Sequence, residues 1–151
     1  MKLFSKEITK SHAIEILNWR YPSPYDLYNQ EVDSEGIEEF LTQSYKVVVD
    51  QEGHLIGFYC TGKSAQVPKG HEFNVYQKDC LDIGLGMKPE LTGRGFGRAF
   101  LAFILKELKT DSLRLTVAKF NKRAIKLYEA FGFEQADAFS NGEVEFITML
   151  K

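Results

Sequence analysis

The stretch that decides the fold is Leu81–Arg98, which reads LDIGLGMKPELTGRGFGR. Its first seven residues predict a strand that ends at Pro89, and the apolar spacing after Phe96 predicts a helix. The turn between them holds three closely spaced glycines: Gly93, Gly95 and Gly97. Glycines let a backbone approach a ligand closely, and N–H groups at a helix N-terminus attract anions. The stretch therefore predicts an anion site at this turn.

Two familiar phosphate-binding motifs do not fit the turn. A P-loop requires Gly-Lys-Ser/Thr, and no lysine follows Gly97. The dinucleotide fingerprint G-x-G-x-x-G/A fails because its last position falls on Arg98 or Phe100. The remaining alternative is a glycine turn with a purely structural role. Because the glycine cluster lies between a strand and a helix, we favour a ligand site over this alternative.

The net charge of −2 is the sum of unequal parts. Residues 1–75 carry 7 basic and 11 acidic side chains (net −4), and residues 76–151 carry 12 and 10 (net +2). The basic window, residues 94–126, has a net charge of +7, because two acidic residues oppose nine basic ones: Arg94, Arg98, Lys106, Lys109, Arg114, Lys119, Lys122, Arg123 and Lys126. Such a local excess indicates a phosphate-bearing partner.

The composition is that of an ordinary soluble globular protein. With 151 residues, 44% of them hydrophobic and 26% charged, we expect one domain over residues 1–151. Cys60 and Cys80 form no C-x-x-C pair and fit a reduced, cytoplasmic setting. The longest apolar run, Ala99 to Leu105, is too short to span a bilayer, and no signal-peptide stretch is expected at the N-terminus.

Periodicity and turn residues predict the element order β-α-α-β-β-β-α-β-α-β-β. The expected strands are 3–8, 45–49, 55–60, 81–87, 113–117 and two within 132–151. The first expected helix follows a cap at Thr9 or Ser11, and three further helices are expected over 33–41, 96–108 and 122–131. A loop is expected over 62–79. Asn141-Gly142 predicts a hairpin turn with positive φ at both residues. We therefore expect an α+β fold with a central mixed sheet flanked by helices.

A second informative segment runs from Leu115 to Glu134. A helix cap would explain Asn121, and a core aromatic would explain Tyr128, if each residue stood alone. Together with the glycine turn, however, the segment resembles the GNAT acetyltransferase superfamily. That family combines a turn of the form Q/R-x-x-G-x-G/A with a later helix of the form Asn-x-x-Ala-x-x-x-Tyr, which ends in Gly-Phe.

The likeness is close over residues 81–134. The turn is Thr92-Gly93-Arg94-Gly95-Phe96-Gly97, the helix runs from Asn121 to Tyr128, and Gly132-Phe133 closes it. One position departs from the family pattern, because Thr92 stands where Gln or Arg is usual. This removes one expected side-chain contact to the pyrophosphate, for which Arg94 and the backbone amides are the available substitutes.

The resemblance implies a direct N-acetyltransferase that uses acetyl-CoA as its co-substrate, bound where two parallel strands splay apart. It implies that the strand end binds the pantetheine arm and that the turn binds the pyrophosphate. The implied cofactor-binding residues are Leu85, Gly86, Met87, Thr92, Gly93, Arg94, Gly95, Phe96, Gly97, Arg98 and Asn121. The rest of the basic window would meet the remaining phosphates.

The resemblance also implies that Tyr128 donates a proton to the departing CoA thiolate. The general base is harder to find, because the position of the family's usual glutamate is Thr116. Asp82 is the best remaining catalytic candidate, although a structural carboxylate is the favoured alternative for it. Glu90 is a weaker candidate, and deprotonation of the amine through water stays open.

Four aromatic residues lie within ten positions and are the candidates for substrate binding: Trp19, Tyr21, Tyr25 and Tyr28. Aromatic side chains near a carboxylate suit a cationic or aromatic amine, and a loop that closes the core explains them equally well. His12, His54 and His71 show no ligand spacing, so we assign no metal.

Two other functions stay open. A non-catalytic acyl-CoA sensor would explain the missing base. Nucleic-acid binding by the basic window is least favoured, because the whole chain is acidic. We therefore expect acetyl-CoA and an amine as partners, without nucleic acid or membrane, and leave a homodimer open.

Overall fold

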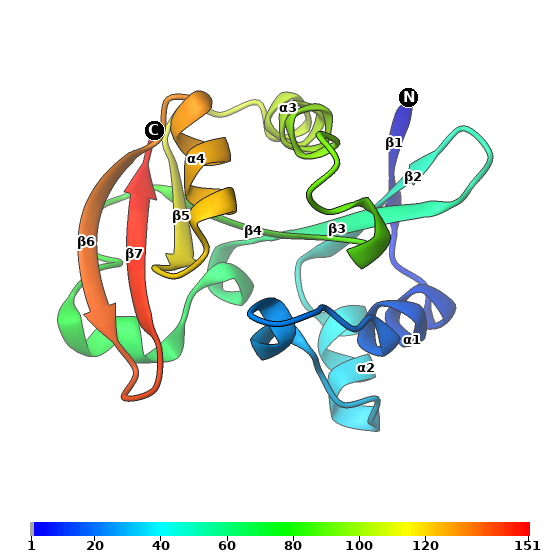
Figure 1. Cartoon of the computed structure of the whole chain (residues 1–151), viewed down its shortest axis with the longest axis horizontal. Helices are drawn as coiled ribbons and strands as arrows, with labels where there is room; N and C mark the ends of the chain where they lie inside the picture. The colour runs from blue at the N-terminus through cyan, green and yellow to red at the C-terminus, as the bar shows by residue number, and fades with distance from the viewer. Residues whose placement is uncertain (1) are drawn as a thin grey trace. The chain divides into compact units, whose positions relative to one another are not determined.

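The computed structural model describes residues 2–151, which form a mixed seven-stranded sheet with helices in an α+β fold (Figure 1). The strands follow the order β1-β2-β3-β4-β5-β7-β6. Their bounds are β1 Leu3–Glu7, β2 Tyr45–Asp50, β3 Leu55–Thr61, β4 Leu81–Met87, β5 Leu113–Ala118, β6 Glu134–Ser140 and β7 Glu145–Leu150. The α-helices are α1 Lys10–Asn18, α2 Ser34–Thr42, α3 Gly97–Leu108 and α4 Lys122–Ala130.

The chain divides into two compact units, Met1–Cys60 with Leu85–Phe103, and Thr61–Gly84 with Ile104–Lys151. Strand β4 contributes to both, since its first four residues belong to the second unit and its last three to the first. One domain over residues 1–151 stays a prediction.

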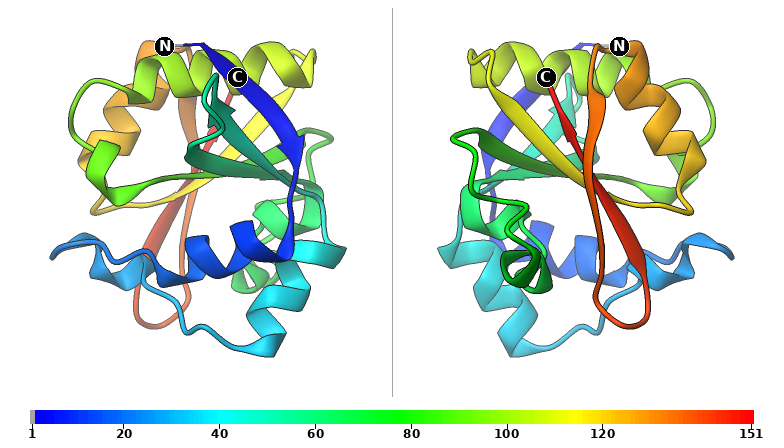
Figure 2. Two further views of the ribbon diagram at one scale, coloured as in Figure 1. Left: turned by 90° about the vertical axis from the view of Figure 1, so that its right-hand side faces the viewer. Right: turned by 90° about the vertical axis from the view of Figure 1, so that its left-hand side faces the viewer.

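In the first unit, β1 pairs antiparallel with β2, and β2 pairs antiparallel with β3. Helices α1 and α2 lie side by side (Figures 1 and 2). Thr9 caps α1 by accepting a hydrogen bond from the His12 N–H, so the first of the two expected caps is confirmed. The core contains Ala13, Ile16, Leu17, Trp19, Phe40, Val47, Val49 and Leu55.

Strands β3 and β4 approach closely within this unit because glycines face each other. A Cβ atom on Gly57 would lie 2.5 Å from the Gly86 carbonyl oxygen and 2.6 Å from the Phe100 ring. A Cβ atom on Gly86 would run into the Phe58 ring. The two glycines therefore leave room for the Phe100 ring against β3 and for the Phe58 ring against β4.

In the second unit, the start of β4 pairs in parallel with β5, from Leu81 opposite Leu113 to Ile83 opposite Leu115. Strand β5 pairs antiparallel with β7, and β7 with β6, which form the orange-to-red hairpin of Figures 1 and 2. The largest buried side chains here include Leu113, Leu115, Phe133 and Met149.

The structure confirms all the predicted α-helices and strands and adds four short 3₁₀ helices: η1 Tyr25–Tyr28, η2 Gly62–Ala65, η3 Pro68–Phe73 and η4 Pro89–Leu91. The predicted turn geometry at Asn141-Gly142 is wrong. Gly142 has φ of 99°, but Asn141 is not among the described residues with positive φ. Instead, the Asn141 side chain accepts hydrogen bonds from the N–H groups of Glu143 and Val144, because the connection spans more than two residues.

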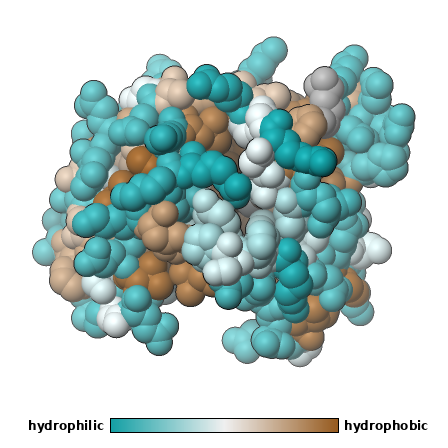
Figure 3. All heavy atoms as spheres, in the orientation of Figure 1, coloured by the Kyte–Doolittle hydropathy of each residue, from teal (hydrophilic) through white to brown (hydrophobic). Residues whose placement is uncertain are grey.

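Hydrophilic side chains cover much of the face shown in Figure 3, with hydrophobic patches between them. None of the helices within residues 2–151 is long and apolar enough to cross a membrane.

Candidate active site

The glycine turn lies between η4 and the start of α3. Gly93 has φ of 70° and Gly95 has φ of 85°, a conformation that side chains with a Cβ atom disfavour. Nothing lies within 4 Å of the place where a Gly95 Cβ would be, so the backbone is open there. The first N–H groups of α3 have no carbonyl partner within their own helix. An open backbone beside such groups suits a phosphate.

Side chains around the turn differ in their accessibility. Arg94 and Arg98 are exposed. Thr92 is half-buried, and its hydroxyl donates a 2.7 Å hydrogen bond to the carbonyl oxygen of Pro89. Its proton therefore stabilises the turn, while a contact from Thr92 to a cofactor stays a prediction.

The end of β4 has one edge on β3 and one edge directed away from it. The N–H of Lys88 donates a 2.9 Å hydrogen bond to the Ile56 carbonyl of β3. The peptide bond between Met87 and Lys88 is trans, so its C=O points opposite to its N–H. Met87 thus directs its carbonyl away from β3, and strand alternation gives the backbone groups of Leu85 the same direction.

The four aromatic candidates occupy different environments in the first unit. Trp19 is buried, stacks on Phe58 with ring centroids 6.2 Å apart, and belongs to the core. Its indole N–H has no hydrogen-bond partner among the described residues. Tyr25 and Tyr28 lie on η1, and Tyr28 is 37% exposed. The burial of Trp19 favours the core-closing alternative for that residue.

Tyr21 connects this aromatic segment to β4. Its hydroxyl donates a 2.8 Å hydrogen bond to the Met87 carbonyl oxygen. Burial, with a smaller contribution from the negative charge of Glu90, raises the pKa of Tyr21 to about 12. Its phenol is therefore protonated throughout the physiological range. Tyr21 was predicted from the sequence as a substrate-binding residue, but the sequence did not indicate its hydrogen bond to β4.

In the second unit, Asn121 directly precedes α4 and Tyr128 lies in the last turn of that helix. Asn121 caps the helix, because its Oδ1 accepts a 3.1 Å hydrogen bond from the N–H of Ala124. Tyr128 is 8% exposed and packs edge-to-face against Phe133, with ring centroids 6.2 Å apart. These positions match the motif Asn-x-x-Ala-x-x-x-Tyr, and their catalytic and binding roles stay predictions.

Asp82 forms a buried ion pair with Arg114. Its carboxylate accepts bonds from the Arg114 guanidinium at 2.6 Å and 2.7 Å, and from the Gln66 amide at 2.9 Å. The hydrogen bond to Asp82 raises the pKa of Arg114 above its usual value. A carboxylate engaged in this way favours a structural role for Asp82 over that of a base. Arg114 is likewise unavailable to cofactor phosphates, although it belongs to the basic window.

The other candidates for a base are no better placed. The Thr116 hydroxyl lies 2.8 Å from the Tyr76 hydroxyl, which also accepts a hydrogen bond from the Val67 N–H. Glu90 is largely exposed and lies 3.9 Å from the Lys88 ammonium. Sequence reasoning missed Tyr76, although it precedes β4 within the same loop that the sequence described as irregular.

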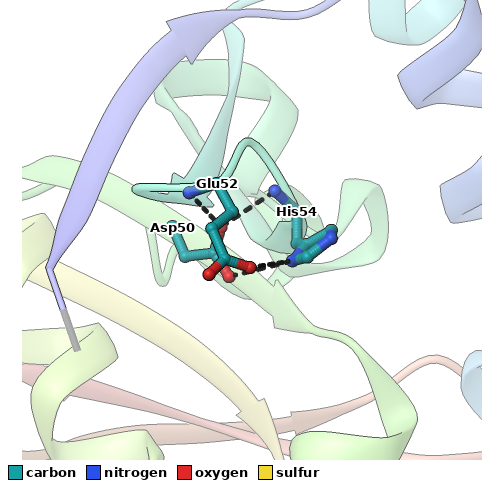
Figure 4. Close-up of side chains that lie close together, drawn as sticks. All are labelled: Asp50, Glu52 and His54. Carbon is teal, nitrogen blue, oxygen red and sulfur yellow. Dashed lines mark hydrogen bonds and ion pairs between the residues drawn. The ribbon is translucent and has the colours of Figure 1, made fainter.

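Asp50, Glu52 and His54 gather at the turn between β2 and β3 (Figure 4). Their possible ligand atoms lie within 4.8 Å of one another, an arrangement that the spacing of the histidines in the sequence did not indicate. Asp50 Oδ1 accepts bonds from the backbone N–H groups of His54 and Glu52, both at 2.9 Å. The bond from His54 contributes most to lowering the Asp50 pKa. Hydrogen bonding of a tight turn accounts for this cluster.

Comparison with known proteins identifies the family. The sequence pattern of the acetyltransferase (GNAT) family matches residues 13–133. This range is most of the chain, so the protein belongs to the GNAT family and is an acyltransferase. The motifs that carry the resemblance lie in the matched range.

Two curated relatives differ in how much they share. The chain is 27% identical over 145 residues to the 5-NmdU N-acetyltransferase of Pseudomonas phage PaMx11, covering 95% of this chain and 94% of the relative. It is 29% identical over 116 residues to the mycothiol acetyltransferase of Streptomyces avermitilis, covering 75% of this chain. The match spans about a third (34%) of that longer protein.

Solved structures agree on the fold. A spermidine N-acetyltransferase SpeG chimera from Vibrio cholerae and hSSAT has a TM-score of 0.69 at 20% identity, with 99% of this chain and 95% of that chain covered. The structure of yncA from Salmonella typhimurium with its cofactor acetyl-CoA has a TM-score of 0.62 at 15% identity, with 100% and 94% covered. At such identities the likeness concerns the fold alone.

Proposed function

We propose that this protein transfers the acetyl group of acetyl-CoA directly to a primary amine. The observation that carries the proposal is the glycine turn with positive φ, open at Gly95, in a chain that also has the Asn121–Tyr128 helix motif. Family membership supports the acyl transfer. The acetyl-CoA in the yncA structure, which has the same fold, supports the co-substrate.

In this proposal the first unit supplies the backbone groups for the cofactor. Leu85 and Met87 present backbone groups at the edge of β4 away from β3, where they would bind the pantetheine arm. The N–H groups of Gly93–Gly97 would bind the pyrophosphate, with Arg94 and Arg98 adding positive charge. Asn121 and the exposed members of the basic window, without Arg114, stay predicted cofactor contacts.

The proposed reaction is direct displacement at the thioester. The amine nitrogen forms a bond to the acetyl carbon, the carbon–sulfur bond breaks, and the amine loses a proton. Binding both reactants together replaces a bimolecular encounter. Backbone N–H groups on β4 would stabilise the developing oxyanion. Tyr128 would give the proton of its phenolic hydroxyl to the leaving thiolate.

We propose that the amine loses its proton through water. Thr116 cannot act as a base, and the Asp82 carboxylate is engaged by Arg114 and Gln66. The acceptor would be an amine that is cationic in solution, because Tyr21, Tyr28 and Glu90 combine aromatic rings with a carboxylate. Among the relatives' names, 5-NmdU and spermidine supply two amines with which to begin.

Two cysteines that form no C-x-x-C pair support a reduced, cytoplasmic setting, which we include in the proposal. A homodimer stays a prediction.

Thiol release from acetyl-CoA tests the proposed function. The purified protein is mixed with acetyl-CoA and, separately, with 5-NmdU and with spermidine, and free CoA is measured against a reaction without amine. We expect amine-dependent CoA release and an acetylated product by mass spectrometry. Tight acetyl-CoA binding with no product from any amine would instead favour the sensor, and no binding of acetyl-CoA would contradict both.

Replacing Gly95 with alanine is expected to weaken acetyl-CoA binding by about tenfold. A Cβ atom at φ of 85° costs about 1–2 kcal/mol, although it meets no neighbour, so the turn would leave its binding conformation. Isothermal titration with acetyl-CoA measures the effect. Gly53→Ala is the matched control, because Gly53 has the same φ and the same open surroundings in the β2–β3 turn. Equal Kd values for acetyl-CoA in the two variants would contradict the proposal that the glycine turn binds the cofactor.

A further inference from the structure

Tyr21 is held at the edge of β4 where the proposed function puts the pantetheine arm. Its hydroxyl bonds to the Met87 carbonyl, which points away from β3 because the Lys88 N–H points toward it. The residue that reaches this edge therefore comes from the segment between α1 and α2, and not from the strands themselves.

The hydrogen bond to Met87 also fixes what else the hydroxyl can do. A carbonyl oxygen only accepts, so the single phenolic proton of Tyr21 is donated to it. The phenolic oxygen can then only accept hydrogen bonds from other groups. A primary amine or its ammonium form offers N–H donors to such an oxygen.

We propose that Tyr21 orients the acceptor amine by accepting a hydrogen bond from one of its N–H groups. This inference rests on the proposed acetyl transfer. With one N–H directed at Tyr21, the nitrogen lone pair left after deprotonation is free to face the acetyl carbon. Orientation of this kind raises the rate because the reacting atoms begin close to their bonding geometry.

The segment around Tyr21 is built to hold the ring in place. The Tyr21 N–H donates a 2.7 Å hydrogen bond to the Asn29 side chain, which closes the segment from its other end. The Tyr28 ring lies edge-on to the Tyr21 ring, with centroids 6.3 Å apart. A side chain fixed at its backbone, ring and hydroxyl can position a substrate without further ordering.

The charge around Tyr21 identifies the class of acceptor. Glu90 lies near enough to raise the Tyr21 pKa, and Tyr21 itself stays neutral. Glu90, which lies 3.9 Å from the Lys88 ammonium, is the charged group that contributes to this shift, and its negative charge favours an amine that arrives as a cation. Because the phenol does not ionise in the physiological range, Tyr21 binds and orients the amine and does not serve as the base.

Tyr21→Phe tests the inference, because it removes the hydroxyl and keeps the ring. With spermidine and 5-NmdU as probes, we expect kcat/KM for the amine to fall about tenfold, the effect of one lost substrate hydrogen bond. The Kd for acetyl-CoA is expected to stay within about twofold of wild type. The pH profile of kcat/KM, measured over about pH 6 to 9, should keep its shape, since no base is removed.

Tyr59→Phe is the matched control. Tyr59 is a buried tyrosine of the same unit, and its hydroxyl bonds to Ser5 at 2.8 Å, away from the end of β4. We expect this control to have wild-type kinetics and a loss of thermal stability similar to that of Tyr21→Phe.

Three results would overturn the inference. Unchanged amine kinetics in Tyr21→Phe, with an active wild type, would refute it and leave the proposed function standing. An equal loss of acetyl-CoA affinity in Tyr21→Phe would show that Tyr21 supports the cofactor-binding end of β4 and does not orient the amine. A wild-type protein that acetylates neither amine would remove the proposed function and this inference together.

Discussion

Replacing Tyr128 with phenylalanine is expected to lower kcat by about 100-fold to 10,000-fold, the usual contribution of a positioned general acid. The CoA thiolate would then leave without a proton. The phenylalanine ring keeps the packing against Phe133, so the fold should be retained. Steady-state kinetics with the best amine of the panel gives kcat, and titration gives the Kd for acetyl-CoA, which should change little.

The buried Tyr59 provides the comparison for this change as well, because Tyr59→Phe removes a hydroxyl with no proposed part in the reaction. If Tyr128→Phe turned over as fast as Tyr59→Phe, the leaving thiolate would not need Tyr128. A loss of acetyl-CoA binding in place of turnover would make Tyr128 a binding residue.

Replacing Arg114 with methionine is expected to lower the free energy of unfolding by about 3–5 kcal/mol. Arg114 and Asp82 have side chains only 2% and 4% exposed, so the change leaves a buried carboxylate with one remaining partner, Gln66. Domains of this kind are stable by about 5–15 kcal/mol, so the loss is a large fraction of the total. Urea unfolding followed by circular dichroism measures it.

Lys119→Met is the matched control for Arg114→Met. Lys119 follows β5 and forms an exposed ion pair with Glu145 at 3.5 Å, and exposed pairs contribute about 0–1 kcal/mol. Replacing Asp82 and Arg114 together with leucine should restore much of the lost stability, because no buried charge remains. Equal effects of Arg114→Met and Lys119→Met would refute the structural role of the pair.

Much of the fold could be predicted because it follows from local patterns. Alternating and helical spacing located every strand and α-helix, and Thr9 and Asn121 were identifiable as caps. The 3₁₀ helices were missed, since single turns leave too short a periodicity. The geometry of the β6–β7 turn was also missed, because the length of a hairpin connection depends on where pairing stops, which Asn141-Gly142 alone does not fix.

The Asp82–Arg114 pair could have been predicted in part. Each residue stands at the second position of a strand between apolar neighbours, Leu81 and Ile83 in one case and Leu113 and Leu115 in the other. Two side chains of opposite charge on neighbouring buried strands are expected to form an ion pair, and the register of β4 and β5 places Asp82 beside Arg114. The ion pair was not predicted because Arg114 was considered only as a member of the basic window.

The contact between Tyr21 and Met87 could not have been predicted, because it joins residues 66 positions apart without a repeating pattern. The sequence did identify a cluster of aromatics, but it could not say that Trp19 enters the core while Tyr21 reaches β4. That separation depends on where the chain leaves α1, which is a property of tertiary packing.

The bond between the Tyr21 N–H and the Asn29 side chain also has a consequence for engineering. This bond joins the two ends of a short connecting segment, residues 22–28. Within the segment, the Tyr25 N–H donates a 2.8 Å hydrogen bond to the carbonyl oxygen of Pro22. A segment closed at its base can be exchanged as a cassette, because its ends already lie together. Acceptor preference could therefore be reprogrammed by grafting only these seven positions, provided that Tyr21 and Asn29 are kept as the fixed ends.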